Sequence, residues 1–592
     1  MNSIKRLLKP IALLSVFALV IISCDKDDSP TTPQEQNQDH NAAAFAENFG
    51  NDILRTFLGT VVDTNDNPID NAMISIGNKT AITDSNGVFI IEDAPVNQRF
   101  GYVKAEKAGF IHASRAVVPS NGTNKVRIMM LAETIAGSTS SGTQETIALA
   151  NGASVALEGA YIKADGSSYS GNVNVIMHHL DPADDNMRDQ MPGMLYAANA
   201  QNEERMLQTF GMLAVELRGS AGEDLNIAEG SSAEIRMPLD ASLMSNAPAT
   251  IPLWYFDEVN GYWIEDGQAT LVGTEYVGTV SHFSFWNCDI PAEYVDFCVT
   301  VLNSDGNPVA NTQVNLTSTN YGTGYGYTNE NGVDCGKIPS GETLELNVYN
   351  YDVCSQSPIY TETVGPFNAD SNISVTIPDN PNIISETVTG LFNDCDGNPV
   401  TNGYVDLKYG EQHFSDLVTD GEFEINLIRC NADDTFRIKA FDYINIQETD
   451  SLYYTFTTPL TNLGSIQSCN TVEEFITYQV DDQPVVTYSF NVYGGLDGNY
   501  LTVNYNSNNQ ENWFNLYIDS FNGPNTYTNS YLNFYDDNFS MVLENYFVGT
   551  TNVTTFGDVG DYIDINFSGL ILDENSADET PISGSIHVLR DY

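Results

Sequence analysis

The chain has 592 residues, too many for one hydrophobic core, so about three to five domains are expected. Its 79 acidic and 23 basic side chains give a formal net charge of −56 at pH 7. This charge excludes nucleic acid as a partner, because phosphate binding needs a basic surface. An apolar fraction of 42% excludes disorder as the dominant state.

The N-terminus has the form of a secretory signal. Lys5, Arg6 and Lys9 precede an apolar run over residues 11–22, and Cys24 follows it. The run is too short to span a bilayer as a stable anchor, and no second apolar run reaches transmembrane length. Residues 1–23 are therefore predicted to be a signal peptide.

The residues around Cys24 carry a more specific resemblance. The ending VIISC (20–24) resembles a bacterial lipobox, which implies cleavage before Cys24 and a lipid on its sulfur. The tract through Lys26, Asp27 and Asp28 resembles the export signal of Bacteroidetes surface lipoproteins. These resemblances imply a lipid-anchored protein on the outer face of a bacterial outer membrane, whose membrane partner is the lipid held through Cys24.

A polar segment and a run of short strands come next. Residues 24–53 are predicted to be the lipidated cysteine and a flexible tether, since the stretch 25–45 is rich in Pro, Gln, Asp and Asn. From residue 54 short alternating apolar segments predict strands. Asn67-Pro68 marks a turn between two of them, and Thr83-Asp84 leads to Gly87, which is expected to take a positive φ in a second turn.

This pair of turn motifs occurs three times, which matters more than any one copy. The second copy has Asn307-Pro308 and then Asn331-Gly332, and the third has Asn398-Pro399 and then Asp420-Gly421. The copies resemble carboxypeptidase regulatory-like modules, which implies small prealbumin-type β-sandwiches whose motifs build turns and are not catalytic. The predicted modules are residues 54–131, 294–379 and 384–474.

Two further β domains are expected beside the repeats. Residues 132–145 are predicted to be a small-polar linker, and residues 146–290 a sandwich interrupted by a loop over 181–204. Methionines in that loop are interpreted as packing residues rather than metal ligands; they are Met187, Met191 and Met194. Residues 476–592, rich in Asn and Tyr, predict a C-terminal β domain. The predicted fold class is all-β, with tandem β-sandwich domains behind the signal peptide and tether.

The strongest candidate for chemistry is His282-Phe283-Ser284. With its aromatic surroundings it resembles the end of self-cleaving β-sandwich domains in adhesion receptors and certain death-domain adaptor proteins. The resemblance implies that Ser284 attacks the Phe283 carbonyl while His282 takes the hydroxyl proton. The alternative is a plain strand, with Val280, His282, Ser284 and Trp286 on one face.

The sequence gives little indication of a metal-binding site. His178 and His179 are adjacent on a predicted strand and so face opposite sides, which favours structural roles. Asp63, Asn65 and Asn67 imitate the start of a calcium loop, but Pro68 follows them at once. No metal ligand set and no cofactor are predicted, and weak surface calcium is the one cation left open.

Cysteines and aromatic residues mark the second half of the chain. The number of cysteines after Cys24 is odd, so at least one thiol is free or pairs between molecules; they are Cys288, Cys298, Cys335, Cys354, Cys395, Cys430 and Cys469. Aromatic residues of the C-terminal segment are either ordinary strand formers or a sugar-stacking surface; they are Trp513, Tyr517, Tyr527, Tyr531 and Tyr535.

The sequence favours a non-enzymatic surface lipoprotein that binds a glycan or protein ligand through tandem sandwiches. One rival is a self-cleaving surface protein, cut at the Phe283–Ser284 bond. Another is a purely structural spacer that presents the C-terminal domain.

Overall fold

The computed structural model describes residues 40–590 with short internal gaps. Cys24, Lys26, Asp27 and Asp28 lie outside the described residues. The internal residues that are not described are 71, 85, 108, 350–356, 380–382, 411, 431–433, 472–473, 481–484, 489–491, 508–511, 537–540, 544–546, 557–561 and 573–578.

The first sandwich packs a three-stranded sheet on a four-stranded sheet. Its strands are β1 (Asp52–Val62), β2 (Met73–Ile76), β3 (Lys79–Ile82), β4 (Val88–Asn97), β5 (Gly101–Glu106), β6 (Ala113–Val117) and β7 (Thr123–Met129). In one sheet β1 lies between antiparallel β4 and parallel β7, and the other has the order β3-β2-β5-β6. Alternation along the strands places Phe57, Val61, Ile74 and Ile76 in the core between the sheets.

The third and fourth sandwiches repeat this topology. The third contains β21 (Tyr294–Leu302), β22 (Gln313–Ser318), β23 (Gly322–Tyr327), β24 (Val333–Pro339), β25 (Leu344–Tyr349), β26 (Tyr360–Val364) and β27 (Ser371–Thr376). The fourth contains β28 (Ile383–Asn393), β29 (Gly403–Tyr409), β30 (Gln412–Leu417), β31 (Glu422–Cys430), β32 (Thr435–Asp442), β33 (Gln447–Glu448), β34 (Leu452–Thr455), β35 (Leu460–Gln467) and β36 (Asn470–Thr471). The orders β24-β21-β27 and β31-β28-β35 match β4-β1-β7, each with its first strand parallel to the last.

The repeated turn motifs make equivalent contacts in the first and third sandwiches. Gly87 and Gly332 have φ values of 69° and 70°. A Cβ there would lie 2.4 Å from Val61 O and 2.6 Å from Val301 O, so only glycine fits so close to the first strand. The prediction of a positive φ at Gly87 is confirmed.

The second domain is built on one continuous 13-stranded sheet that folds around its core. Its strands are β8 (Ile135–Ser140), β9 (Glu145–Ala148), β10 (Ser154–Leu157), β11 (Tyr161–Lys163), β12 (Asn172–Leu180), β13 (Tyr196–Ala198), β14 (Glu204–Gly219), β15 (Asp224–Ile227), β16 (Ala233–Pro238), β17 (Thr250–Asp257), β18 (Tyr262–Val272), β19 (Glu275–Val280) and β20 (Phe285–Ala292). Long β14 pairs with β12 and β15 near its end and with β13 and β20 near its start. Its register with β20 shifts between Thr209 and Met212, where the strand bends.

The sequence prediction differs from the structure around this domain. Residues assigned to a linker, 132–145, include β8 and the start of β9, because β8 pairs with β12 and so extends the sheet. The loop over 181–204 contains the short helix α2 (Met187–Gln190) and β13. Met191 is buried and Met187 and Met194 pack against core clusters, so the interpretation of these methionines as packing residues is confirmed.

Residues at the end of the predicted tether are also ordered. They carry the helix α1 (Ala42–Ala46) and the 3-10 turn η1 (Glu47–Phe49). Phe45 is fully buried against Tyr262, with ring centroids 4.5 Å apart, and Phe49 stacks on Phe100 of the first sandwich. These aromatic contacts fix residues 42–49 between the first two domains, which polar composition alone did not predict.

The fifth sandwich packs a six-stranded sheet on a five-stranded sheet. Its strands are β37 (Phe475–Val480), β38 (Val486–Tyr488), β39 (Val492–Asp497), β40 (Tyr500–Asn506), β41 (Trp513–Ile518), β42 (Asn525–Tyr527), β43 (Ser530–Asp536), β44 (Met541–Leu543), β45 (Phe547–Phe556), β46 (Tyr562–Leu572) and β47 (Glu579–Leu589). The sheets have the orders β38-β37-β47-β46-β45-β42 and β39-β40-β41-β43-β44. The predicted all-β fold of tandem sandwiches is therefore confirmed.

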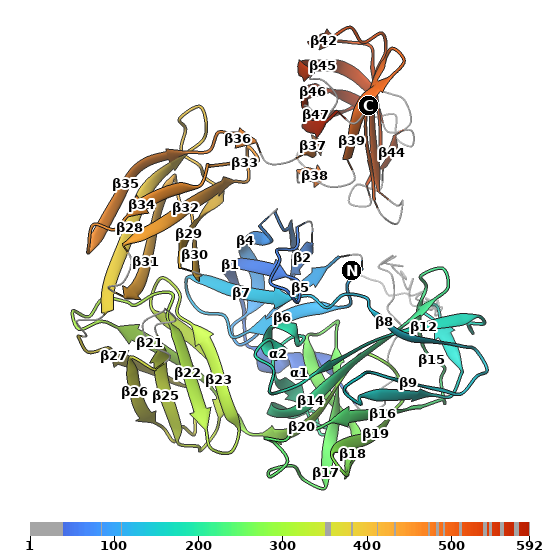
Figure 1. The fold of residues 1–592 in the computed structure, drawn as a ribbon, viewed down its shortest axis with the longest axis vertical. Helices are drawn as coiled ribbons and strands as arrows, with labels where there is room; N and C mark the ends of the chain where they lie inside the picture. The colour runs from blue at the N-terminus through green and yellow to red at the C-terminus, as the bar shows by residue number, and fades with distance from the viewer. Residues whose placement is uncertain are drawn as a thin grey trace, which may run out of the picture.

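The domains are arranged as a group of four and a fifth that stands apart (Figure 1). Apolar clusters bridge the first sandwich to its neighbours: Ile111 packs with Trp254 of the second domain, and Leu58 with Tyr404 of the fourth. Ile428 of the fourth sandwich joins the core of the third. No helix in the described part of the chain is long and apolar enough to cross a membrane.

Candidate functional sites

The His282-Phe283-Ser284 tripeptide lies in a bend between β19 and β20. The plain-strand alternative is therefore wrong for residues 281–284, because β19 ends at Val280 and β20 begins at Phe285. The His282 ring packs on Tyr255 and Trp286, with centroids 4.6 and 5.1 Å away. The bend is thus a tightly packed aromatic corner.

Asn226 of β15 holds the middle of this bend. Its Oδ1 accepts a hydrogen bond from Phe283 N at 2.8 Å, and its Nδ2 donates to Phe283 O at 3.2 Å. The Ser284 hydroxyl is buried and donates to Phe285 O at 3.2 Å. Sequence reasoning missed Asn226, since nothing in a window around residue 226 points to a contact 57 residues away.

The residues considered as metal ligands, for which the sequence favoured structural roles, have protein partners. His178 Nε2 lies 2.8 Å from Ala132 O, and His179 Nδ1 lies 3.1 Å from Asn151 Nδ2. Asp63 Oδ1 accepts hydrogen bonds from the backbone N–H groups of Asn65 and Asn67, which close the turn. Within the described residues no group of three or more His, Cys, Asp or Glu side chains is placed to hold a metal ion.

The cysteines form two described disulfides and one free thiol. Cys298 is bonded to Cys335 across β21 and β24, and Cys395 to Cys469 in the fourth sandwich. Cys288 is free and fully buried, and burial raises the pKa of its thiol. Cys354 and the side chain of Cys430 lie outside the described part. The odd number of cysteines predicted at least one thiol that is free or pairs between molecules, and Cys288 is free in this structure.

The repeated turn motif also has a second role, which links sandwiches to one another. Asp84 Oδ1 accepts hydrogen bonds from Asn86 N and Val88 N, each 2.9 Å away, and closes its own turn. Its other oxygen, Oδ2, accepts from Tyr404 OH at 2.8 Å and Tyr443 OH at 3.3 Å, both in the fourth sandwich. One carboxylate thus ties the first sandwich to the fourth.

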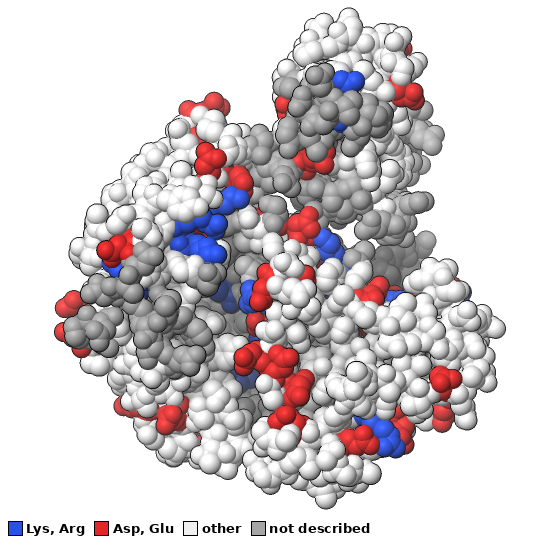
Figure 2. All heavy atoms as spheres, in the orientation of Figure 1, with Lys and Arg blue, Asp and Glu red and all other residues white. Residues whose placement is uncertain are grey.

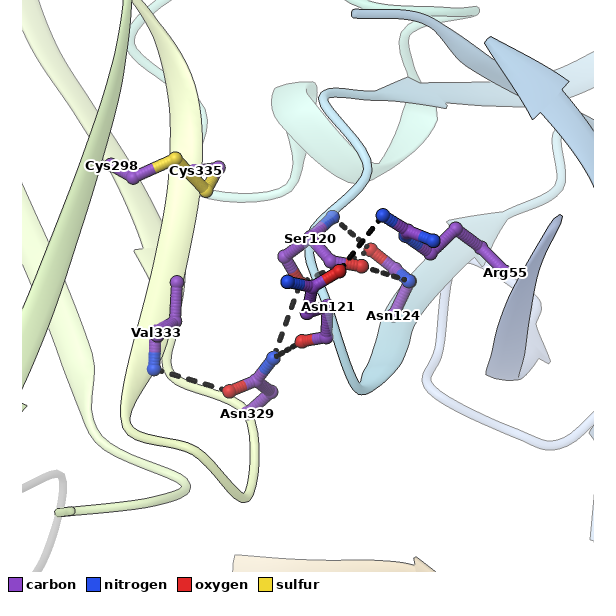
Figure 3. Close-up of a disulfide and its surroundings, with 8 residues drawn as sticks. All are labelled: Arg55, Ser120, Asn121, Asn124, Cys298, Asn329, Val333 and Cys335. Carbon is purple, nitrogen blue, oxygen red and sulfur yellow. Dashed lines mark hydrogen bonds between the residues drawn. A yellow bond between two sulfur atoms is a disulfide. The ribbon is translucent and has the colours of Figure 1, made fainter. Parts of the chain in front are cut away.

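The equivalent residue of the second copy, Asn329, repeats this arrangement (Figure 3). Its Oδ1 accepts from Val333 N at 3.1 Å within its own turn. Its Nδ2 donates to Ser120 Oγ at 3.1 Å and to Asn121 O at 2.6 Å, on the first sandwich. Since the same motif position reaches a different neighbour in these two copies, only the domain arrangement assigns its partner.

Buried charges lie at the same contacts. Lys125 of β7 donates from Nζ to Asn311 Oδ1 at 2.6 Å and to Ser415 O at 2.8 Å, so it joins three sandwiches, and burial lowers its pKa. Burial raises the pKa of Asp84 to about 6. These groups hold the domains together and contact no other candidate site.

A polar hollow lies where the first three domains meet. It is lined by Arg99, Glu203, Glu204, Arg205, Glu293 and Tyr294. Its charges pair with nearby groups: Arg99 with Asp296, and Arg205 Nη2 with Glu203 Oε2 at 2.6 Å. Lys337 Nζ lies 2.9 Å from Asp296 Oδ1 beneath it. The hollow is therefore lined by paired charges, of which the Arg99–Asp296 pair joins the first sandwich to the third.

The aromatic residues singled out in the C-terminal segment divide into two groups. Tyr527 is buried, and its hydroxyl hydrogen-bonds Asn522 and Gly523. It belongs to β42 in the six-stranded sheet, so its inclusion in a sugar-binding surface was wrong. The other four, Trp513, Tyr517, Tyr531 and Tyr535, lie on β41 and β43 of the opposite sheet.

Known proteins resemble the chain only in part. No protein-family profile matches it. Over 198 residues it is 26% identical to cartilage intermediate layer protein 2 of Mus musculus, a match that covers 31% of this chain and 17% of that protein. The chain therefore corresponds to a small part of the mouse protein's length.

Superpositions on solved structures give low scores. The shaft pilin SpaA of Lactobacillus rhamnosus GG aligns with 30% of this chain and 99% of its own, at 10% identity and a TM-score of 0.16. BcpA, the major pilin subunit of Bacillus cereus, aligns with 71% and 100%, at 9% identity and a TM-score of 0.12. The Bacillus anthracis TIE protein aligns with 70% and 51%, at 7% identity and a TM-score of 0.13. Such scores establish no common fold. The evidence for the sandwich architecture is therefore the strand pairing within this chain.

Proposed function

We propose that the chain is a non-enzymatic binding protein on the outer surface of a bacterial outer membrane, anchored by a lipid on Cys24. The observation that carries this proposal is the domain arrangement: four sandwiches share buried contacts, and the fifth stands apart at one end (Figure 1). A base of four packed domains with a separate end domain suits a protein that presents a binding surface. The anchor and the Bacteroidetes-type export signal rest on the sequence around residues 20–28.

Antibody labelling of intact cells tests this proposal. The wild-type chain is expected to label on intact cells, and Cys24→Ala is expected to lose most of the label, because the acyl chains supply the membrane affinity. A triple alanine variant at Lys26, Asp27 and Asp28 should keep membrane association but lose surface label. Gln34→Ala, in the tether, is the control. Equal labelling of wild-type and Cys24→Ala cells would contradict the proposal.

Self-cleavage between Phe283 and Ser284 is the second candidate, and Asn226 favours it. Asn226 Nδ2 donates to the carbonyl oxygen of Phe283, where negative charge develops when a nucleophile attacks. The Ser284 hydroxyl, however, donates to Phe285 O. That orientation is not the one in which His282 takes the hydroxyl proton, so the non-enzymatic function is preferred.

A denaturing gel decides between the two candidates. We expect the purified wild-type chain to run as a single full-length band, because the Ser284 hydroxyl donates its hydrogen bond to the Phe285 carbonyl oxygen and not to His282. Ser281→Ala, in the exposed part of the same bend, is the matched control for Ser284→Ala. Two wild-type bands that merge in Ser284→Ala and persist in Ser281→Ala would establish self-cleavage instead.

A further inference from the structure

The five-stranded sheet of the fifth sandwich has one apolar face and one polar aromatic face. Residues at alternate positions, such as Leu501, Val503, Phe514, Leu516 and Phe534, are buried in the core. The residues between them on β40, β41 and β43 must therefore point out of the sandwich. The side chains that point out are aromatic or carry amide or hydroxyl groups.

Strand register arranges these outward side chains in rows across the sheet. Asn504, Asn515 and Asn533 are direct neighbours on β40, β41 and β43, and form an amide row. On one side of this row Tyr517 lies opposite Tyr531. Cross-strand neighbours of this kind lie about 5 Å apart, so each row is a continuous strip.

A second aromatic pair lies on the other side of the amide row. Trp513 is opposite Tyr535, four residues along β41 from Tyr517, which places the two aromatic pairs about 13 Å apart. Tyr493 of β39 extends the amide row, because it is paired with Asn504. Tyr531 and Tyr493 are each 46% exposed. We name these three rows the outer face.

None of the Trp, Tyr and Asn side chains that make up the outer face is charged, although the rest of the fifth sandwich carries many Asp and Glu. The chain has no Lys or Arg between Lys439 and Arg590. In the view of Figure 2, which shows one side of the molecule, acidic side chains are scattered among mostly uncharged described residues of the fifth sandwich, at the top. The outer face therefore has no basic side chain that could pair with a polyanion. Its amide and phenol groups can instead hydrogen-bond a neutral ligand that is rich in hydroxyl groups.

We propose that the outer face binds a neutral polysaccharide, with its chain laid across the two aromatic pairs and the amide row between them. This proposal rests on the proposed binding function and names its ligand class. Sugar rings present C–H groups on their faces, which pack on flat aromatic rings, and hydroxyl groups at their edges. The Asn504 and Asn515 amides each carry two donors and an acceptor oxygen, which suit the hydroxyl groups along a sugar chain.

A protein partner fits the outer face less well. Protein interfaces bury a continuous, closely packed centre that is often rich in aromatic residues. Here the amide row separates the two aromatic pairs, so the described outward side chains form no continuous apolar centre. A flat face with aromatic pairs separated by amides instead matches a repeating polar chain. Self-association of two copies of this chain through the outer face is the other result that the experiment below can detect.

Affinity electrophoresis with the detergent-solubilised full-length chain tests the proposal. Native gels contain one of β-glucan, xylan, galactomannan or α-mannan, or heparin as the anionic comparison. The chain is expected to be retarded by at least one neutral polysaccharide and not by heparin. Trp513→Ala and Tyr531→Ala should each raise the dissociation constant at least about tenfold, since each removes a central aromatic contact. Tyr453→Ala is the matched control, because Tyr453 is 76% exposed on the fourth sandwich.

Several outcomes would overturn the proposal. Retardation by none of the four neutral polysaccharides rejects it, as does retardation that survives both aromatic substitutions or that occurs equally in heparin. A dimer of the wild-type chain that dissociates in Trp513→Ala would assign the outer face to self-association. If intact cells still carry the chain on their surface while no polysaccharide binds, the proposed function stands and only the ligand class fails.

Discussion

Replacing Glu386 by alanine is expected to destabilise the fourth sandwich by about 3–5 kcal/mol. Glu386 and Arg429 are each 1% exposed, and Glu386 Oε1 lies 3.0 Å from Arg429 Nε and 2.7 Å from Nη2. The substitution removes this buried counter-charge and leaves Asp434, an exposed carboxylate whose oxygen is 3.0 Å from Nη1. Hydrogen exchange of the β28 and β31 amides, which pair directly, measures the loss.

An exposed ion pair provides the control for this prediction. Lys104 Nζ and Glu106 Oε1 lie 3.9 Å apart on the first sandwich, with side chains 36% and 53% exposed. Glu106→Ala should change stability by less than about 1 kcal/mol, because water solvates both charges. If the two substitutions had equal effects, burial would not explain the importance of the Glu386–Arg429 pair.

Acidification from pH 7 to pH 4 is expected to strengthen the contact between the first and fourth sandwiches. Burial raises the pKa of Asp84 from 3.8 to about 6. The Asp84 carboxyl group therefore binds a proton more tightly when the first and fourth sandwiches are in contact than when they are apart. This contribution is fully present below about pH 4 and is lost as pH rises through about 6, by up to about 3 kcal/mol. Hydrogen exchange in β29, which carries Tyr404, follows the contact as a function of pH.

Asp84→Asn should flatten this pH dependence, because the amide does not titrate. Burial also raises the pKa of Asp416 to about 6 and of Asp334 to about 7, so the difference between the wild type and the variant isolates Asp84. Asp394→Asn is the control: its carboxylate caps an exposed turn, where hydrogen bonds from Asn398 lower its pKa. An unchanged pH profile in Asp84→Asn would show that Asp84 does not govern the contact.

Much of the fold could be predicted from short sequence windows. Alternating apolar residues and the Asn-Pro and Gly turns predict the strands and turns of three repeats, because side-chain period and turn geometry depend on neighbouring residues alone. That these repeats are sandwiches was implied by a family resemblance and not by the local pattern. Gly87 illustrates this, since its φ of 69° follows from the turn that contains it. The odd cysteine count likewise predicts, without any knowledge of the fold, that at least one thiol lacks a partner within the chain, as Cys288 does.

The candidate sites depended on contacts between distant residues. Sequence reasoning placed Tyr527 with the exposed aromatic residues, yet it belongs to the other sheet and is buried. It found the Phe283–Ser284 bond but not Asn226, which reaches that bond from β15. A sequence window carries no information on which strands become neighbours, so it could not separate these residues.

By itself the sequence determined the all-β tandem architecture and the turns that define each repeat. Only the tertiary structure decided which neighbour each turn contacts: Asp84 reaches the fourth sandwich, and Asn329 reaches the first. It also decided that Asn504, Asn515 and Asn533 form one row. The physical reason is that strand periodicity and turn chemistry are local, whereas register and domain packing arise from long-range pairing of the whole chain.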